Sequence, residues 1–243
     1  LWAVLAARGV AFEARPFQLG VRVEHPQELV TAARYGAEPG AEALGAASYN
    51  LVSRAAGGVA AAHSFCMCPG GRIVASVNEP GLLCTNGMSN SRHSSRWATA
   101  ALVTTIAPAA FAALAPLEPE GSEGAVGAAG AEGAFAGVAL QRALERRFFE
   151  AGGADFGAPA QRADDFLRGV AGAHLPPSSW RFGLVPARLD RLLPRAVAAG
   201  VALALERFDR AIPGFAGPAG LLVGIESRSS SARAKDVPDL AAV

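Results

Sequence analysis

Arginine, histidine and glutamate side chains that could bind a ligand or move a proton lie close together early in the sequence. Arg22, Glu24 and His25 stand at the end of a predicted strand, and the ends of strands are common places for binding residues. This group could contact a substrate or cofactor, or it could form an ion-paired rim with a capping histidine. We treat His25 as a candidate catalytic residue and Arg22 as a candidate cofactor ligand.

A second stretch, 63–103, contains all three cysteines and both methionines of the chain. Cys66 and Cys68 are two positions apart, so on a strand they would face the same side. They could be small buried thiols, a redox pair or metal ligands. Because Cys84 is single and no Cys-x-x-Cys pair is present, we assign no metal site. Cys66 and Cys68 remain candidate catalytic residues.

The most polar part of this stretch begins at Asn86 and continues through Arg92 and Arg96. Two arginines among serines and backbone amides could bind an anionic ligand. The alternative is an ordinary solvated loop. Asn86, Arg92 and Arg96 are therefore candidate cofactor-binding residues.

Two later polar positions join this set. Gln161 follows Gly152-Gly153 and Pro159, a segment in which the backbone could approach a flat ligand closely, although glycines also end helices in the ordinary way. Arg228 belongs to a polar cluster that follows a predicted strand. That cluster could be either a rim ion pair or part of a site. We include Gln161 and Arg228 as candidate cofactor-binding residues.

The hydrophobic pattern predicts an α+β fold. Apolar residues alternate with polar ones over 17–24, which predicts a strand with one buried face. The sequence predicts further strands at 63–68, 72–77, 82–86, 97–106 and 221–227, and helices at 138–150, 161–170 and 190–210. We expect one domain, 1–243, with a mixed or antiparallel sheet that could close toward a barrel and a helical layer. A flexible low-complexity insertion is expected at 115–134 and an irregular tail at 229–243.

Composition excludes several classes of protein. The formal net charge of +1 argues against a dedicated nucleic-acid binder. No apolar run is long enough to span a membrane without proline or charge. An odd, small number of cysteines suits a reducing compartment better than a disulfide scaffold. Gly-x-Ser-x-Gly, His-Glu-x-x-His and P-loop motifs do not occur, so the residues alone indicate a soluble domain with a polar loop cluster.

Seven segments, in one order along the chain, carry a more specific pattern. They are PFQLGVRVEHPQELV (16–30), SFCMCPGGRIVASVNEPGLLCTNGMS (64–89), SRHSSRWATAALVTT (91–105), VALQRALERRFFEAGG (138–153), APAQRADDFL (158–167), LPPSSWRFGLVPARLDRLLP (175–194) and GIESRSSS (224–231). Together they resemble a family of FAD-dependent dehydrogenase-like proteins of bacteria and of plant and algal plastids. CMCPGG followed by TNGMS is the most specific signal, and RHSSRWA is most similar to the plastid branch.

The resemblance implies FAD as the cofactor of the full-length protein. In the family, an N-terminal Rossmann half and a C-terminal glycine-rich segment hold the flavin, and this sequence contains neither. It resembles the middle and C-terminal, substrate-side part. Two departures stand out, because the family's Ala-Asn-Ala is here Ala98-Thr99-Ala100 and its Thr-Ser-Ser-Pro is Ser229-Ser230-Ser231-Ala232. The second places the flavin-side end of the resemblance in question.

On this resemblance we expect the substrate-side domain of an FAD-dependent oxidoreductase or dehydrogenase, inactive as this chain alone and acting on a small-molecule substrate. The resemblance also implies a plastid location, and otherwise a soluble protein inside the cell, with no nucleic-acid or membrane partner. The alternative is a non-catalytic binding or interaction domain that keeps the fold without flavin.

Overall fold

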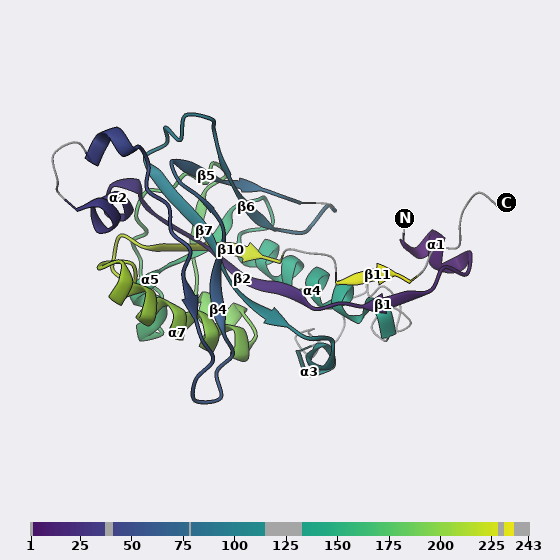
Figure 1. Ribbon diagram of the computed structural model, residues 1–243. Helices are drawn as coiled ribbons and strands as arrows, with labels where there is room; N and C mark the ends of the chain where they lie inside the picture. Colours follow the sequence, from purple (N-terminus) through teal and green to yellow (C-terminus); the bar gives the residue numbers. More distant parts are fainter. Residues whose placement is uncertain (1, 37–40, 78, 115–132, 228–230, 236–243) are drawn as a thin grey trace. The chain divides into compact units, whose positions relative to one another are not determined.

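Two compact units make up the chain in this computed structural model, which describes residues 2–36, 41–77, 79–114, 133–227 and 231–235 (Figure 1). Unit 1 comprises Leu1–Phe17, Ile106–Ala143 and Arg228–Val243, and unit 2 comprises Gln18–Thr105 and Leu144–Ser227. Helices and strands both contribute to the fold, so the α+β class expected from the sequence is confirmed.

A seven-stranded sheet forms the centre of unit 2, in the order β3–β4–β7–β2–β10–β8–β9. The strands are β3 (Val52–Ser53), β4 (Ala62–Cys68), β7 (Trp97–Ile106), β2 (Phe17–Pro26), β10 (Leu221–Glu226), β8 (Ala158–Arg162) and β9 (Leu184–Pro186). β10 is antiparallel to both β2 and β8, β4 is antiparallel to both β3 and β7, and β8 and β9 are parallel. Because β3 and β9 stand at opposite ends of this order, the described sheet is mixed and open, and it does not close into a barrel.

The central strand β2 separates two chemically different faces of the sheet. Phe17, Leu19, Val21 and Val23 are buried on one face, as the alternation in the sequence predicts. Successive side chains of a strand point to opposite sides, so Arg22 and Glu24 point to the other face. Those two side chains are also buried, which means that both faces of β2 are covered.

Helix α7 (Arg195–Ala211) packs on β3 and β4 through a buried stripe. The stripe consists of Val197, Val201, Leu205 and Phe208. The short helices α5 (Ala163–Arg168) and α6 (Leu189–Leu192) contact α7. The sequence predicts one helix over 190–210, but Leu193 is extended and the helix begins again after Pro194. Proline lacks an N–H group and disfavours a helical residue before it, so it divides the predicted helix into α6 and α7.

A two-stranded antiparallel ribbon, β5 (Gly71–Ala75) and β6 (Thr85–Ser89), packs near β4 and β10. In Figure 1 it lies on the other side of the sheet from α5 and α7. The Thr85 hydroxyl donates a hydrogen bond of 2.9 Å to the carbonyl oxygen of Ile225, which fixes β6 against β10. The strands predicted at 63–68, 72–77, 82–86 and 97–106 would form a β-meander if each paired with the next, but β4 pairs with β7 while β5 and β6 pair with each other. Helix α2 (Gln27–Tyr35) and the short helix η1 (Ala41–Leu44) complete this part of unit 2.

Unit 1 is small, and a strand pair joins its distant segments. Its elements are α1 (Trp2–Ala7), β1 (Phe12–Ala14), η2 (Pro108–Ala110), α3 (Phe111–Leu114), η3 (Gly133–Phe135) and β11 (Ala232–Ala234). β1 and β11 are antiparallel, with Ala14 opposite Ala232. The Phe12 and Phe135 rings are 4.9 Å apart, and those of Phe17 and Phe111 are 5.5 Å apart. Apolar contacts and the strand pair thus hold the unit together.

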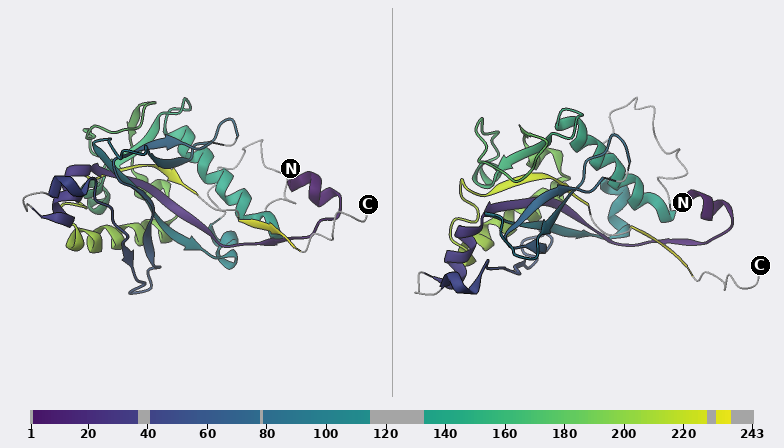
Figure 2. Two further views of the ribbon diagram at one scale, coloured as in Figure 1. Left: turned by 45° about the horizontal axis from the view of Figure 1, so that its top comes forward. Right: turned by 90° about the horizontal axis from the view of Figure 1, so that it is seen from above.

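Three segments lie at a boundary of the two units or of the described residues. Helix α4 (Ala136–Ala151), drawn in teal in Figure 2, contributes residues up to Ala143 to unit 1 and the rest to unit 2. Of the predicted insertion at 115–134, residues 115–132 lie outside the described residues. In the predicted tail, 229–230 and 236–243 likewise lie outside them, and the part between contains β11.

Candidate functional site

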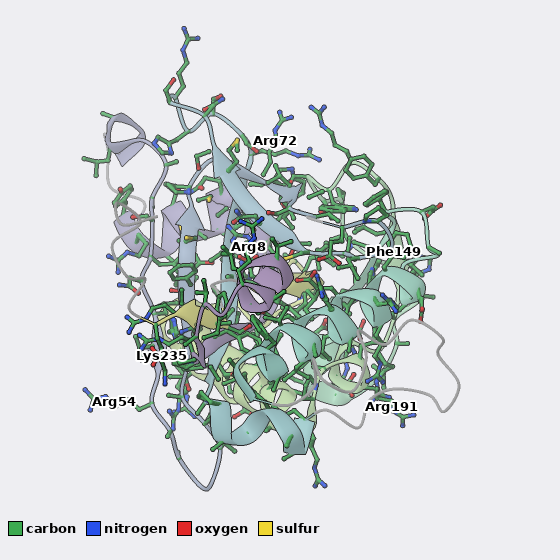
Figure 3. All side chains as sticks on the ribbon, turned by 90° about the vertical axis from the view of Figure 1, so that its right-hand side faces the viewer. Arg8, Arg54, Arg72, Phe149, Arg191 and Lys235 are labelled. Carbon is green, nitrogen blue, oxygen red and sulfur yellow. The ribbon has the colours of Figure 1, made fainter. Side chains whose placement is uncertain are left out.

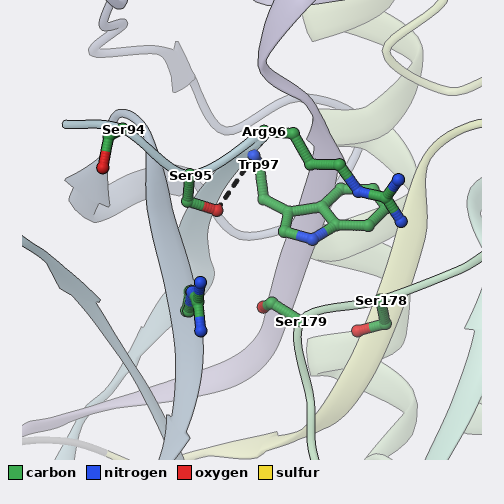
Figure 4. Close-up of a pocket in the computed structure, with 7 residues that line it drawn as sticks. Ser94, Ser95, Arg96, Trp97, Ser178 and Ser179 are labelled. Carbon is green, nitrogen blue, oxygen red and sulfur yellow. Dashed lines mark hydrogen bonds between the residues drawn. The ribbon is translucent and has the colours of Figure 1, made fainter.

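Unit 2 contains an open, polar pocket of about 400 Å³ (Figure 4). Three separate segments line it: β5, the turn between β6 and β7, and the loop before β9. The lining residues are Arg72, Ser94, Ser95, Arg96, Trp97, Ser178 and Ser179. The volume is within the range of pockets that hold small ligands, and the two arginines and four serines favour a polar one.

Ser94 and Ser95 keep hydrogen-bonding capacity for a ligand. The Ser94 hydroxyl oxygen accepts a bond of 2.8 Å from the side-chain amide of Asn90, and that of Ser95 accepts one of 3.2 Å from the backbone N–H of Trp97. Figure 4 shows the second of these bonds as a dashed line. Because a hydroxyl can donate as well as accept, the protons of both serines remain available to a ligand oxygen.

Two guanidinium groups give the pocket its charge. Arg72 is exposed on β5 (Figure 3), and the Arg96 guanidinium carbon lies 4.6 Å from the centre of the Trp97 ring. Stacking on an aromatic face stabilises a cation and restricts its position. Among the residues that the structure describes, neither arginine forms an ion pair.

A buried carboxyl group, Glu24, holds one wall of the pocket in place. The Ser179 N–H donates a bond of 2.9 Å to one carboxyl oxygen, and the Ser179 hydroxyl donates to the other. The same hydroxyl oxygen accepts a bond of 2.7 Å from the backbone N–H of Ile73. Burial raises the pKa of Glu24, although hydrogen bonds from Ser178 and Ser179 oppose this. Glu24 therefore connects β2 and the loop directly, and it connects them to β5 through the Ser179 hydroxyl.

Arg22 is the centre of a buried polar network next to this wall. Its Nε donates to the hydroxyl oxygen of Thr99 at 3.0 Å, and one Nη lies 3.5 Å from a carboxyl oxygen of Glu226. The other Nη donates to the carbonyl oxygen of Cys66 at 2.9 Å and lies 3.4 Å from Cys68 Sγ. Thr99 is the position at which this sequence departs from the Ala-Asn-Ala pattern. Arg22 and Glu226 at the centre of the network both have 0% exposure.

His25 is enclosed in the core of unit 2. Its Nε2 donates to the carbonyl oxygen of Phe215 at 2.7 Å, and the two rings are 4.3 Å apart. A carbonyl can only accept, so Nε2 carries the proton. Burial lowers the pKa of His25 to about 4, so the ring is neutral near pH 7.

The structure brings some of the predicted residues together and separates others. Arg96 lines the pocket, and Arg22, Cys66 and Cys68 meet in the buried network. The amide of Gln161 is buried and bonded to Val170, Leu189 and Asp190. Each of these contacts is internal to unit 2.

The remaining candidates lie elsewhere. Asn86, in β6, accepts a bond of 2.8 Å from the backbone of Gly87, and Arg92 is exposed in the turn after β6. Arg228 lies outside the described residues. Cys66 is exposed and Cys68 is half-buried. Within the described ranges, no group of three His, Cys, Asp or Glu side chains is placed to hold a metal ion.

Sequence reasoning missed most of the pocket. Arg72 and the serines at 94, 95, 178 and 179 carry no motif, and they come from segments that are far apart in the chain. One signal was available, since a Ser-Ser pair shortly before a tryptophan occurs twice, as SSRW at 94–97 and SSW at 178–180. The serines of both copies line the same pocket.

Comparison with known proteins identifies the family. Residues 16–229 match the family described as "FAD-dependent protein, C-terminal domain-like", and the chain belongs to this family. It is also 33% identical over 230 residues to an uncharacterised protein of Clostridium beijerinckii. The match covers 94% of this chain but 40% of that relative. This chain therefore spans less than half of the length of that relative. None of the described helices is long and apolar enough to cross a membrane.

The described residues do not fit the pyrophosphate of FAD. A pyrophosphate usually binds where a parallel strand leads through a glycine-rich turn into a helix. The described parallel pair is β8–β9, and α5 follows β8 directly. No glycine-rich turn separates β8 from α5, and the first-turn Asp164 and Asp165 are already ion-paired with Arg162 and Arg168. Helices α2 and α7 begin directly after Pro26 and Pro194, so no glycine-rich turn leads into either of them.

Proposed function

We propose that this chain is the substrate-side domain of an FAD-dependent oxidoreductase. The observation that carries the proposal is a cationic pocket in a domain of this family, in which no glycine-rich turn joins the described parallel strand β8 to its helix. A domain with this pair of properties can bind and orient a substrate, while the dinucleotide is held by another part of a longer protein. The 40% coverage of the bacterial relative supports this division.

The strand pair in unit 1 supports the same arrangement. β1 leads into unit 2 and β11 follows it, and the two strands are antiparallel. The chain therefore enters and leaves along neighbouring strands. Paired strands of this kind allow a domain to be inserted into a loop of another domain without separating the parts on either side.

A bound flavin would supply the redox chemistry, because hydride transfer belongs to the cofactor. The residues of this chain would bind and orient the substrate. Arg72 and Arg96 would attract it, Ser94 and Ser95 would donate to its oxygen atoms, and Glu24 would keep the Ser178–Ser179 wall in place. The reacting atoms of the substrate would be placed by these contacts.

Two flavin measurements test the proposal. The longer C. beijerinckii protein is purified, its absorbance is recorded with and without added FAD, and this 243-residue chain is titrated with FAD separately. We expect flavin bands near 370 and 450 nm (roughly, for any oxidised flavin) in the longer protein and no stoichiometric binding to this chain. If the longer protein stays colourless with FAD, the alternative function, a non-catalytic binding domain, is favoured instead. Tight binding of FAD by this chain alone would contradict the division between substrate and flavin.

We also propose the plastid location that the resemblance implies. The relative found here is bacterial, so support for a plastid comes from the RHSSRWA segment alone. Import of the complete gene product, fused to a fluorescent protein, into isolated chloroplasts tests it. Retention of the fusion outside the organelle would remove the plastid from the proposal.

A further inference from the structure

The pocket of unit 2 has an excess of positive charge and of hydrogen-bond donors. Arg72 and Arg96 contribute two cations, and Ser94 and Ser95 contribute hydroxyl protons that no described residue accepts. The lining residue Ser179 is hydrogen-bonded to the carboxyl group of Glu24, which has 1% exposure. Nothing that a ligand would meet in the described lining carries a negative charge.

We infer that this pocket binds an oxyanion, namely a carboxylate or phosphate group of the substrate. That this anion belongs to a substrate rests on the proposed function, whereas the anion site itself is inferred from the residues that line the pocket. Guanidinium groups bind both kinds of oxyanion through charge-assisted hydrogen bonds. Serine hydroxyls can complete the shell of donors around the oxygen atoms.

The geometry around Arg96 makes it the better fixed of the two cations. Its guanidinium stacks on Trp97 at 4.6 Å, and Trp97 is the first residue of β7. A cation held against a strand loses less conformational freedom on binding than a free side chain does. Arg72 is on β5, and the backbone N–H of its neighbour Ile73 donates to Ser179. Arg72 thus stands on a strand and Arg96 directly before one, and Ser179 joins β5 to the opposite wall.

Anion binding to the 243-residue chain is measured by two-dimensional amide NMR. Sodium phosphate and sodium benzoate are titrated separately, with ionic strength held constant by sodium chloride. We expect saturable shifts at Ser94–Trp97 and at Ser178 and Ser179. Arg72→Ala and Arg96→Ala should each weaken binding about tenfold or more, as expected when a charge-assisted hydrogen bond is lost. Arg34→Ala removes the same charge from an exposed position of α2 and should leave binding unchanged.

The outcomes separate this inference from the proposed function. Tighter binding of phosphate identifies a phosphorylated substrate, and tighter binding of benzoate identifies a carboxylate; either result supports the site. Absence of saturable binding by both anions, or equal weakening by Arg34→Ala and Arg72→Ala, overturns it. Because these titrations contain no flavin, they can fail while the longer protein binds FAD, and they can succeed while it does not.

Discussion

At the scale of single residues, arginines in this protein perform two different tasks. Arg22 is enclosed, with its donors directed at Thr99, Cys66 and Glu226. Arg72 and Arg96 face an open pocket and pair with no described carboxylate. A buried arginine that is already bonded contributes to folding and register, whereas an arginine without a partner beside a pocket can bind a ligand.

Removing the buried cation should be strongly destabilising. Arg22→Met removes the guanidinium that lies 3.5 Å from the buried carboxyl group of Glu226, and removal of one partner of a buried ion pair typically costs about 3–5 kcal/mol. We expect a fall of that order in the free energy of unfolding, measured by urea denaturation with circular dichroism. The double variant Arg22→Met/Glu226→Leu should recover much of the loss, because both buried charges are then absent. If the two substitutions add, the ion pair is not the reason for the loss.

His25 should make the stability of the chain depend on pH. Its pKa is about 4 in the folded protein and near 6.5 when unfolded, so between these values the unfolded chain binds more protons. The free energy of unfolding should therefore fall as pH decreases from 6.5 to 4, by up to roughly 3 kcal/mol from this residue. Urea titrations across this range measure it.

The control for this prediction is His25→Gln, which can still donate to Phe215 but does not titrate. The difference between the two proteins isolates His25 from Glu24, whose raised pKa acts in the opposite direction, since it lowers stability as pH rises above 4.5. A His25→Gln variant with the same pH dependence as the parent would show that another group is responsible.

At the scale of elements, β6 must pass very close to the Arg22 side chain. A Cβ atom added at Gly87 would lie 1.7 Å from an Nη of Arg22 and 2.8 Å from Cys68 Sγ. Gly87→Ala should therefore displace the guanidinium and lower the free energy of unfolding by about 3 kcal/mol or more, as overpacking and loss of a buried network do. Thermal unfolding compares it with Met88→Ala, a change at the exposed neighbouring position that should have little effect. Equal melting temperatures for the two variants would contradict the close approach.

Local patterns predict the elements of this fold better than their pairing. The alternation over 17–24 identifies β2, and the apolar stripe beginning at Val197 identifies most of α7, because burial of one face imposes these periods. β8 was missed, since Ala158–Arg162 is short, contains Pro159 and precedes a helical pattern. The break at Pro194 was missed because the apolar stripe continues past it.

The pairing of distant segments lies beyond such patterns. β2 lies between β7 and β10, and the residues from 17 to 26 do not predict which strands pair with β2. The same is true of the pocket. Arg96 could be predicted from the polar residues next to it in the sequence. Arg72 joins the pocket only because the strand that carries it is hydrogen-bonded to Ser179. Sequence therefore indicates which residues could bind an anion, while the sheet order decides which of them meet.

At the scale of the whole molecule, the proposed insertion of this domain into a longer protein depends on the pairing of β1 with β11. Ala14 and Ala232 are directly opposite. Backbone hydrogen bonds join the flanking positions, from Arg15 to Ser231 and from Lys235 to Ala11, both 2.8 Å. Hydrogen-bonded and non-hydrogen-bonded pairs alternate along an antiparallel ribbon, and in the second kind the Cα atoms are about 4.5 Å apart. By this alternation Ala14 and Ala232 form a non-hydrogen-bonded pair.

Cysteines at these two positions should form a disulfide. Their expected separation lies within the range of about 4.4–6.8 Å that a disulfide spans, and both native side chains are small. We expect Ala14→Cys/Ala232→Cys to cross-link on mild oxidation, as detected by mass spectrometry of the linked peptides. The matched control is Ala14→Cys/Arg233→Cys, because Arg233 pairs with Glu13 and its side chain points to the other face of the ribbon. The cross-link should also raise the melting temperature, since it closes a long loop. Equal cross-linking in both variants would mean that the ends are merely near each other, and the case for an inserted domain would lose its support from the strand pair.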